Sequence, residues 1–171
     1  MSILQNKVIV ITGAAIGLGF AASKECARQG AKLAMVDVNE EKLNKAVEEI
    51  KKECTNTEIK AIIADVSNEE DVKKYIQITV DTFGRIDGLY NNAGIEGKQA
   101  SITDYDLSVF KKVIDINLMG VFYAIRHVLP IMEKQKYGRI VNVASVGGIR
   151  GVMNQMPYVA SKHAVAGMTK N

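Results

Sequence analysis

The sequence predicts an α/β fold in which helices cover both faces of a doubly wound parallel sheet. Two observations predict it: apolar, β-branched runs of strand length alternate with patterns of helical spacing, and the first run passes into a cluster of glycines. No repeat, linker or low-complexity tract interrupts the chain, so residues 1–171 are expected to form a single domain. The expected strand order, 3-2-1-4-5, places a ligand crevice above strands 1 and 4.

The composition is that of an ordinary globular protein and excludes several classes of function. Of the 171 residues, 24% are charged and 47% are hydrophobic, and 22 basic against 19 acidic residues give a net charge of +3. This charge is too small to indicate binding to nucleic acid or to an anionic membrane surface. Because no uninterrupted apolar run reaches the length of a membrane span, and residues 1–7 do not resemble a signal peptide, we expect a cytoplasmic protein.

The cysteines and histidines show neither a disulfide framework nor a metal-binding pattern. Cys26 and Cys54 are far apart in the sequence and are interpreted as reduced packing residues. His127 and His163 lack the spacing of metal ligands. We therefore predict that the protein has no metal site.

The first predicted strand, residues 7–12, leads directly into a glycine turn. This turn, Gly13-Ala14-Ala15-Ile16-Gly17-Leu18-Gly19, precedes a helix expected over residues 20–29 that Gly30 ends. Amides at a helix N-terminus bind phosphate, and glycine lets the backbone approach a pyrophosphate closely. We interpret the turn as a phosphate-binding site. The alternative is that its glycines only allow a tight connection.

Asp37 lies at the end of the second predicted strand, residues 32–38. A carboxylate about twenty residues after such a turn holds the ribose hydroxyls of a dinucleotide and repels a 2′-phosphate. Neither Ile16 nor Val38 supplies a cation for that phosphate, so we predict a preference for NAD over NADP. Alternatively, Asp37 only begins a loop and caps the following helix.

Two further strands end in polar residues on the same edge of the sheet. The third, residues 59–66, contains Asp65, and the fourth, residues 85–91, leads into Asn91-Asn92-Ala93-Gly94. The carboxyl ends of parallel strands border the ligand crevice. Without a ligand, the Asn-Asn-Ala-Gly segment would simply be a turn.

The connecting helices begin and end at recognisable caps. Asn39 is expected to cap a helix over residues 40–53, and the capping box Ser67 to Glu70 is expected to begin a helix that ends before Gly84. A longer helix is expected over residues 104–135, with Asp106 or Ser108 as its cap.

Asn117 interrupts this long helix at a weak point, residues 117–120. A buried asparagine needs hydrogen-bond partners. Asn117 is therefore either a residue that bonds one helix to another or part of a polar relay. After the helix, a fifth strand over residues 139–143 leads to Ser145, which is expected on the same edge of the sheet as the glycine turn.

The last predicted helix begins near Met156 and carries Tyr158 and Lys162. Pro157 suits the first turn of this helix, and residues four apart lie on one helix face. A nearby ammonium lowers the pKa of a tyrosine from its ordinary value of about 10, which makes the phenol a general acid or base. On a solvated helix face the same pair would have no catalytic role.

Together these segments resemble the short-chain dehydrogenase/reductase family over essentially the whole chain. The motifs occur in the family's order: Thr12-Gly-x-x-x-Gly-x-Gly19, Asp37, Asp65-Val66, Asn91-Asn92-Ala93-Gly94, Asn117, Ser145 and Tyr158-x-x-x-Lys162. Each motif is weak alone, but the set is specific. The resemblance implies a Rossmann-like fold and the NAD(H)-dependent interconversion of a small-molecule secondary alcohol and a ketone.

The resemblance also implies a role for each motif. Tyr158 would exchange a proton with the substrate oxygen, and Lys162 would lower the pKa of Tyr158 and bind the nicotinamide ribose. Ser145 would hydrogen-bond the substrate oxygen, and Asn117 would hold a water that connects Lys162 to solvent. Besides Tyr158 and Lys162, the residues implied in cofactor binding are Gly13, Ile16, Gly17, Leu18, Gly19, Asp37, Val38, Asp65, Val66, Asn91, Ala93 and Gly94.

Within the family, residues 94–99 and 144–151 resemble levodione-type reductases, which act on cyclic ketones. The candidate residues of a substrate pocket are Val146, Met153, Gln155 and Met156. Relatives assemble through their long helices, so the resemblance implies a homodimer or homotetramer. The positions that fit such packing, and that fit the core of a single chain equally well, are Val113, Val121, Phe122 and Val128.

Members of this family are longer than this chain, so the resemblance implies that a C-terminal third with further strands is absent. Residues 140–143 would then form an exposed apolar sheet edge, which favours association. Two alternatives to an active dehydrogenase remain. One is a truncated remnant that binds dinucleotide or self-associates without turnover. The other is a 3-oxoacyl-carrier reductase, which Asp37 disfavours because such enzymes usually take NADPH.

Overall fold

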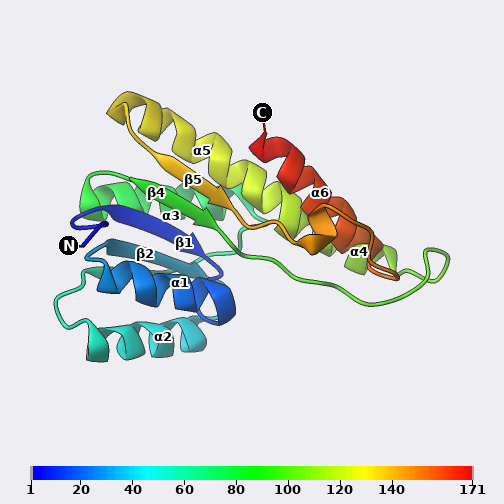
Figure 1. The fold of residues 1–171 in the computed structure, drawn as a ribbon, viewed down its shortest axis with the longest axis horizontal. Helices are drawn as coiled ribbons and strands as arrows, with labels where there is room; N and C mark the ends of the chain where they lie inside the picture. The colour runs from blue at the N-terminus through cyan, green and yellow to red at the C-terminus, as the bar shows by residue number, and fades with distance from the viewer. Residues whose placement is uncertain (1, 171) are drawn as a thin grey trace.

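Five parallel strands form one sheet in the order β3-β2-β1-β4-β5, as the sequence predicted (Figure 1). The computed structural model describes residues 2–170. Its strands are β1 (Val8–Thr12), β2 (Lys32–Asp37), β3 (Ile59–Ile63), β4 (Gly88–Asn91) and β5 (Arg139–Asn142). Val10 in the central strand pairs with Ala34 of β2 and Leu89 of β4. Since all pairs are parallel, every connection is a crossover that a helix or loop must make.

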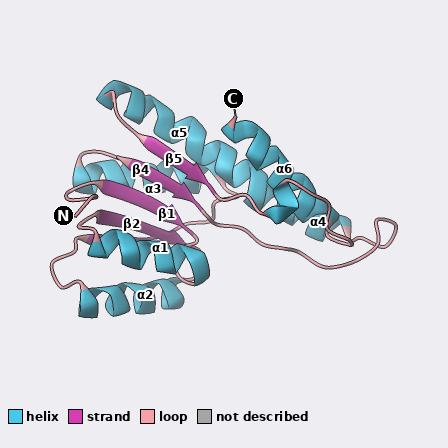
Figure 2. Ribbon diagram, viewed as in Figure 1, coloured by secondary structure: helices cyan, strands magenta, loops and turns pink. Residues whose placement is uncertain are grey.

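Helices cover both faces of the sheet (Figure 2). They are α1 (Gly17–Arg28), α2 (Glu40–Glu53), α3 (Glu69–Phe83), α4 (Leu107–Ile114), the π-helical segment η1 (Asp115–Met119), α5 (Gly120–Gln135), the 3₁₀ turn η2 (Val146–Gly148) and α6 (Met156–Thr169). Helices α1 and α2 pack on one face of the sheet, and α3 and α5 pack on the other.

The continuous apolar strands serve two cores because successive side chains point to opposite faces. In β1, Val10 packs with the α3 and α5 side, whereas Ile11 packs with the α1 and α2 side. Both residues are fully buried. A sheet buried on both faces explains why the sequence shows unbroken apolar runs where a half-exposed sheet would show alternation.

Several predicted boundaries differ from those in the structure. Strand β3 ends at Ile63, before Asp65, and β4 begins only at Gly88. The residues before β4 are engaged otherwise, because the Asp87 carboxylate accepts hydrogen bonds from the Val8 amide and from Arg85. Helix α1 begins at Gly17, three residues earlier than predicted, so the end of the glycine turn forms its first turn.

The predicted cap of α3 is wrong by one residue. Asn68 is the N-cap, and its side chain accepts hydrogen bonds from the amides of Glu70 and Asp71. The amide and hydroxyl of Ser67 instead donate to the Asp65 carboxylate. The caps predicted at Asn39 and Asp106 and the glycine stop at Gly84 are confirmed.

The long helix is continuous from Leu107 to Gln135, but its middle is a π-helix at the predicted weak point. Among the described residues, this 29-residue segment is the one helix with the length and mean hydropathy of a membrane span, although no uninterrupted apolar run has that length. Of its most apolar stretch, 28% is buried in the structure. Core helices meet the same two criteria, and this segment packs against α3 and α6.

Candidate active site

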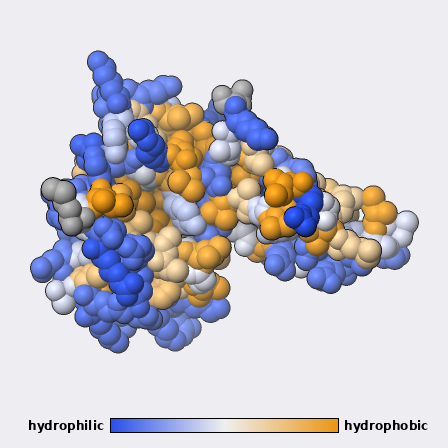
Figure 3. Space-filling view, viewed as in Figure 1, coloured by the Kyte–Doolittle hydropathy of each residue, from blue (hydrophilic) through white to orange (hydrophobic). Residues whose placement is uncertain are grey.

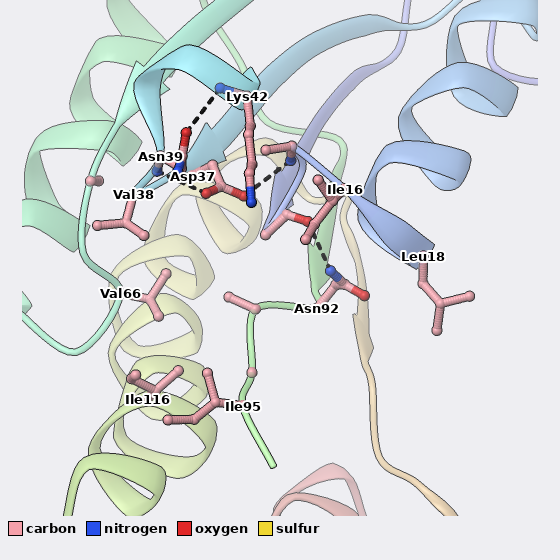
Figure 4. Close-up of a pocket in the computed structure, with 15 residues that line it drawn as sticks. Ile16, Leu18, Asp37, Val38, Asn39, Lys42, Val66, Asn92, Ile95 and Ile116 are labelled. Carbon is pink, nitrogen blue, oxygen red and sulfur yellow. Dashed lines mark hydrogen bonds between the residues drawn. The ribbon is translucent and has the colours of Figure 1, made fainter. Parts of the chain in front are cut away.

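A cavity of about 380 Å³ opens at the carboxyl ends of the first four strands (Figure 4). Residues that follow β1, β2, β3 and β4 contribute to its wall, as expected for an open parallel sheet. The lining residues are Gly13, Ala15, Ile16, Leu18, Asp37, Val38, Asn39, Lys42, Ala64, Val66, Asn92, Ala93, Gly94, Ile95 and Ile116. The predicted crevice above β1 and β4 is therefore present.

The glycine turn is held closed by the loop that follows β4. The Asn92 side-chain amide donates to the carbonyl oxygens of Thr12 and Gly13, over 3.0 and 3.2 Å. Thr12 Oγ1 in return accepts from the amides of Asn92 and Ala93. A Cβ on Gly19 would overlap the Gly13 carbonyl, so the turn has no room for a side chain there. This packing brings bare backbone to the cavity wall, which is what close approach of a pyrophosphate requires.

Asp37 faces the cavity with both carboxylate oxygens fixed. Oδ2 accepts from the Ala15 amide of the glycine turn at 3.0 Å, and Oδ1 accepts from the Asn39 amide at 2.9 Å. The cap of α2 is Asn39, whose side chain accepts from the Lys42 amide. Asn39, and not Asp37, therefore caps α2. Each carboxylate oxygen keeps acceptor capacity for a hydroxyl in the cavity.

Eight of the predicted cofactor residues line the cavity: Gly13, Ile16, Leu18, Asp37, Val38, Val66, Ala93 and Gly94. Asp65 and Asn91 do not. Asp65 is exposed and accepts from Ser67, and the Asn91 amide donates to Asn142 Oδ1 at 2.8 Å, which ties β4 to β5. Gly17 and Gly19 also lie outside the wall and shape the turn behind it.

Lys162 is buried within 5.9 Å of the Tyr158 ring centre. Its Nζ donates to the Val143 carbonyl at 2.7 Å, and burial lowers the pKa of the amine below its ordinary value. A Cβ on Gly94 would lie 3.5 Å from Lys162 Nζ and 3.2 Å from Asn117 Oδ1. Gly94 therefore connects the cavity wall to Lys162 and Asn117, although neither of these residues lines the cavity itself.

Asn117 is fully buried and joins three segments of the chain. Its Oδ1 accepts from the Ile95 amide at 2.8 Å, and its Nδ2 donates to the Ile95 carbonyl at 2.8 Å and to Ser161 Oγ at 3.2 Å. Ser161 Oγ donates to the Tyr158 carbonyl at 2.7 Å. Asn117 thus bonds the long helix to α6, which was one of the two roles predicted. Asn117 lies in the π-helical segment η1, a form of helix that is frequent at functional sites.

Ser145 and Tyr158 both lie close to Gly147. A Cβ on Gly147 would lie 3.3 Å from the Tyr158 ring and 3.7 Å from Ser145 Oγ, and the Gly147 amide donates to Ser145 Oγ at 3.1 Å. Near these residues, apolar side chains gather around η2 on the surface (Figure 3). Val146 and Met153, two of the predicted pocket residues, are 58% and 86% exposed.

Seven lining residues were not among the predicted site residues: Ala15, Asn39, Lys42, Ala64, Asn92, Ile95 and Ile116. Ala15 lies inside the glycine turn and Asn92 inside the Asn-Asn-Ala-Gly segment, so their motifs could have indicated both. Lys42 and Ile116 lie on helices, where no local pattern marks a residue as facing a cavity. Among residues 2–170, no three His, Cys, Asp or Glu side chains are placed to hold a metal ion.

Known proteins share both the sequence and the fold. Levodione reductase of Leifsonia aquatica is 46% identical over 166 residues, which are 97% of this chain and 62% of that protein. Cyclohexanol dehydrogenase of Acinetobacter sp. (strain SE19) is 38% identical over 97% of this chain and 65% of its own length. This chain therefore spans a little under two thirds of the length of these relatives.

Solved structures agree with these matches. The crystal structure of levodione reductase superposes with a TM-score of 0.96 at 46% identity, over 98% of this chain and 65% of that one. NAD⁺-bound xylitol dehydrogenase superposes with a TM-score of 0.94 at 36% identity, over 98% of this chain and 64% of that one. The family model described as short chain dehydrogenase matches residues 7–171, so this chain belongs to the short-chain dehydrogenase family.

Proposed function

We propose that the chain binds NAD(H) and carries the catalytic residues of an oxidoreductase that interconverts a secondary alcohol and a ketone. The observation that carries this proposal is the position of Asn117 and Lys162 beside Gly94, which borders the cavity at the strand ends, with the Tyr158 ring centre 5.9 Å from Lys162 Nζ. Cyclic alcohols and ketones are the proposed substrates, since the relatives include a levodione reductase and a cyclohexanol dehydrogenase.

The residues of the cavity fit a dinucleotide. Gly13 presents bare backbone at the cavity wall, and Gly19 leaves room for the turn to close behind it. Asp37 offers fixed carboxylate oxygens for ribose hydroxyls. NAD supplies the hydride acceptor when bound. The negative charge of Asp37 opposes a 2′-phosphate, which supports NAD as the preferred cofactor and disfavours a 3-oxoacyl-carrier reductase that uses NADPH. The NAD⁺-bound xylitol dehydrogenase with the same fold supports this choice.

Each catalytic residue would have a different part in the reaction. The Tyr158 hydroxyl exchanges a proton with the substrate oxygen, and Ser145 Oγ donates a hydrogen bond to that oxygen. Lys162, whose Nζ lies 5.9 Å from the centre of the Tyr158 ring, binds the nicotinamide ribose. Asn117 fixes the start of α6 through Ser161, and so holds Tyr158 at a constant position relative to Gly94.

Tyr158→Phe tests this proposal. We expect the variant to bind NADH as the unaltered chain does, which fluorescence titration measures, and to lose turnover of cyclohexanol by roughly 10² to 10⁴-fold. Tyr137→Phe is the control and should change neither quantity. Tyr137 is 39% exposed and lies in the loop between α5 and β5. Turnover that survives in Tyr158→Phe would refute the assignment.

A remnant that binds dinucleotide without turnover is the second candidate, because the chain spans about 62% of the length of levodione reductase. NADH binding by the 171-residue chain without oxidation of any cyclic or acyclic alcohol would favour it.

We also propose a cytoplasmic homodimer or homotetramer. The free thiols of Cys26 and Cys54 support a reducing compartment, and Phe122, 40% exposed on α5, offers a contact surface. Val113, Val121 and Val128 are buried within the chain and contribute to its core.

A further inference from the structure

Gly120, the first residue of α5, is buried at a close contact with Val66. A Cβ on Gly120 would lie 3.0 Å from Val66 Cγ2, 3.0 Å from the Val66 carbonyl oxygen and 3.1 Å from Val66 Cβ. Carbon atoms in favourable contact are about 3.5–4.0 Å apart. A side chain at position 120 would therefore push Val66 away from the long helix.

Helix stability does not explain a glycine at this position. Glycine is less favourable than alanine inside a helix, and Gly120 lies within the helix that runs from Leu107 to Gln135. Gly167 on α6 shows that a helical glycine need not be crowded, since no atom beyond its chain neighbours and its own helix backbone lies within 4 Å of a Cβ there. The contact with Val66 is therefore the feature that a larger residue at position 120 would disturb.

Val66 separates Gly120 from the cavity. Its side chain is half-buried: it faces Gly120 on the long helix, and it also forms part of the cavity wall. In Figure 4, Val66 extends from the segment after β3 and Ile116 from the long helix, and both line the cavity. Because the cavity is the open space beside Val66, a valine displaced from Gly120 would enter it and make it shallower.

This part of the cavity lies next to Asp37. Ile63, the last residue of β3, pairs with Asp37, and the Ala64 amide donates to the Asp37 carbonyl at 3.2 Å. Asp37 and Val66 therefore follow neighbouring strands, and both line the cavity. If Asp37 holds the adenosine ribose, as the proposed function requires, the apolar wall at Val66 faces the adenosine half of the dinucleotide.

We propose that Gly120 is a positioning residue that keeps Val66 out of the cavity and so makes room for the adenosine half of NAD(H). This inference rests on the proposed function and extends it to a residue outside the cavity wall. Gly120 acts through Val66: the missing side chain lets Val66 pack directly on the long helix, and the depth of the cavity follows from that packing.

The free chain and the complex respond differently to a methyl group at position 120. In the free chain Val66 can move into an empty cavity, so Gly120→Ala should unfold at the same or a slightly higher urea concentration, because alanine favours the helix. In the complex the displaced Val66 and the adenosine compete for the same space. Crowding of this kind should weaken binding by about five- to thirtyfold.

Fluorescence titration of the 171-residue chain with NADH, and displacement of NADH by AMP, measure this effect. In Gly120→Ala the dissociation constants of NADH and of AMP should rise by the same factor, because AMP carries the adenosine half alone. Gly167→Ala is the matched control: it makes the same change in a helical glycine away from the cavity wall, and it should alter neither dissociation constant.

A shorter side chain at position 66 separates this role from a general disturbance of the fold. Val66→Ala removes the methyl groups that would enter the cavity. In the Val66→Ala background, the factor by which Gly120→Ala raises the dissociation constant of NADH should be smaller by about threefold or more.

A Gly120→Ala chain that binds NADH and AMP as tightly as the unaltered chain, or an undiminished factor in the Val66→Ala background, would overturn the inference while leaving the proposed function intact. A markedly lower urea midpoint in Gly120→Ala would also overturn it, because Val66 would then lack free space to enter. If the unaltered chain did not bind NADH, the proposed function itself would fail, and the inference with it.

Discussion

At the scale of single residues, the site depends on a buried amine. Lys162 has only 4% of its surface exposed and one hydrogen bond, to the Val143 carbonyl. Burial disfavours the charged form of a lysine, which is why the pKa of this amine lies below 10.5. The native state therefore stores an electrostatic cost at a residue that the proposed reaction uses.

The lowered pKa of Lys162 predicts how the free energy of unfolding depends on pH. Between the lowered pKa of Lys162 and 10.5, the unfolded chain binds more protons than the native chain, so this residue raises the free energy of unfolding as pH increases through that window. Lys162→Met lacks this contribution. Urea unfolding of both proteins at neutral pH and near pH 10 should show the unaltered chain gaining stability relative to the variant. A difference that does not change with pH would contradict the prediction.

At the scale of elements, the loop after β4 and the glycine turn after β1 form one unit. The Asn92 side-chain amide donates to the carbonyls of Thr12 and Gly13, and Gly19 at the end of the turn packs directly against Gly13 at its start. A side chain at Gly19 would meet backbone atoms, which cannot rotate away. The cavity wall is therefore sensitive to a single methyl group at this position.

Gly19→Ala should destabilise the chain by about 1–3 kcal/mol and reduce its affinity for NADH, because the turn must open to admit the Cβ. Gly151→Ala is the matched control. No atom lies within 4 Å of a Cβ there, so this variant should be as stable as the unaltered chain or slightly more so. Urea unfolding and NADH titration measure the two effects. Equal behaviour of both variants would show that the predicted clash is absent.

At the scale of the whole molecule, β5 is an edge strand in the described part of the chain, with β4 as its neighbour. Val141 on this strand is 53% exposed, and Figure 3 shows apolar surface over β5. Edge strands with unpaired backbone groups and apolar side chains favour association with other chains. Of the predicted apolar edge over residues 140–143, only Val141 is exposed in the structure, whereas Ile140 and Val143 are half-buried.

Val141→Lys should reduce concentration-dependent self-association of the chain, because a charged side chain on an edge strand opposes further strand pairing. Sedimentation velocity over a range of protein concentrations measures this. Ile102→Lys is the control: Ile102 is 70% exposed but lies in a loop, so the same change of side chain there should have a smaller effect. If both variants reduced association equally, general surface hydropathy would be the cause, and not the strand edge.

The sequence by itself determined the sheet order, the two-sided burial of the strands and the motifs that end them, because these follow from local periodicity and from the connection rules of parallel sheets. It also indicated an interruption of the long helix near Asn117, since asparagine and glycine are weak helix formers. Only the tertiary structure decided which residues face the cavity. Asp65 and Asn91 bond to Ser67 and Asn142 instead, and Lys42 lines the cavity from α2, where no sequence motif marked it. The physical reason is that a cavity wall depends on the relative placement of several loops and on helix phase, and no local pattern records either.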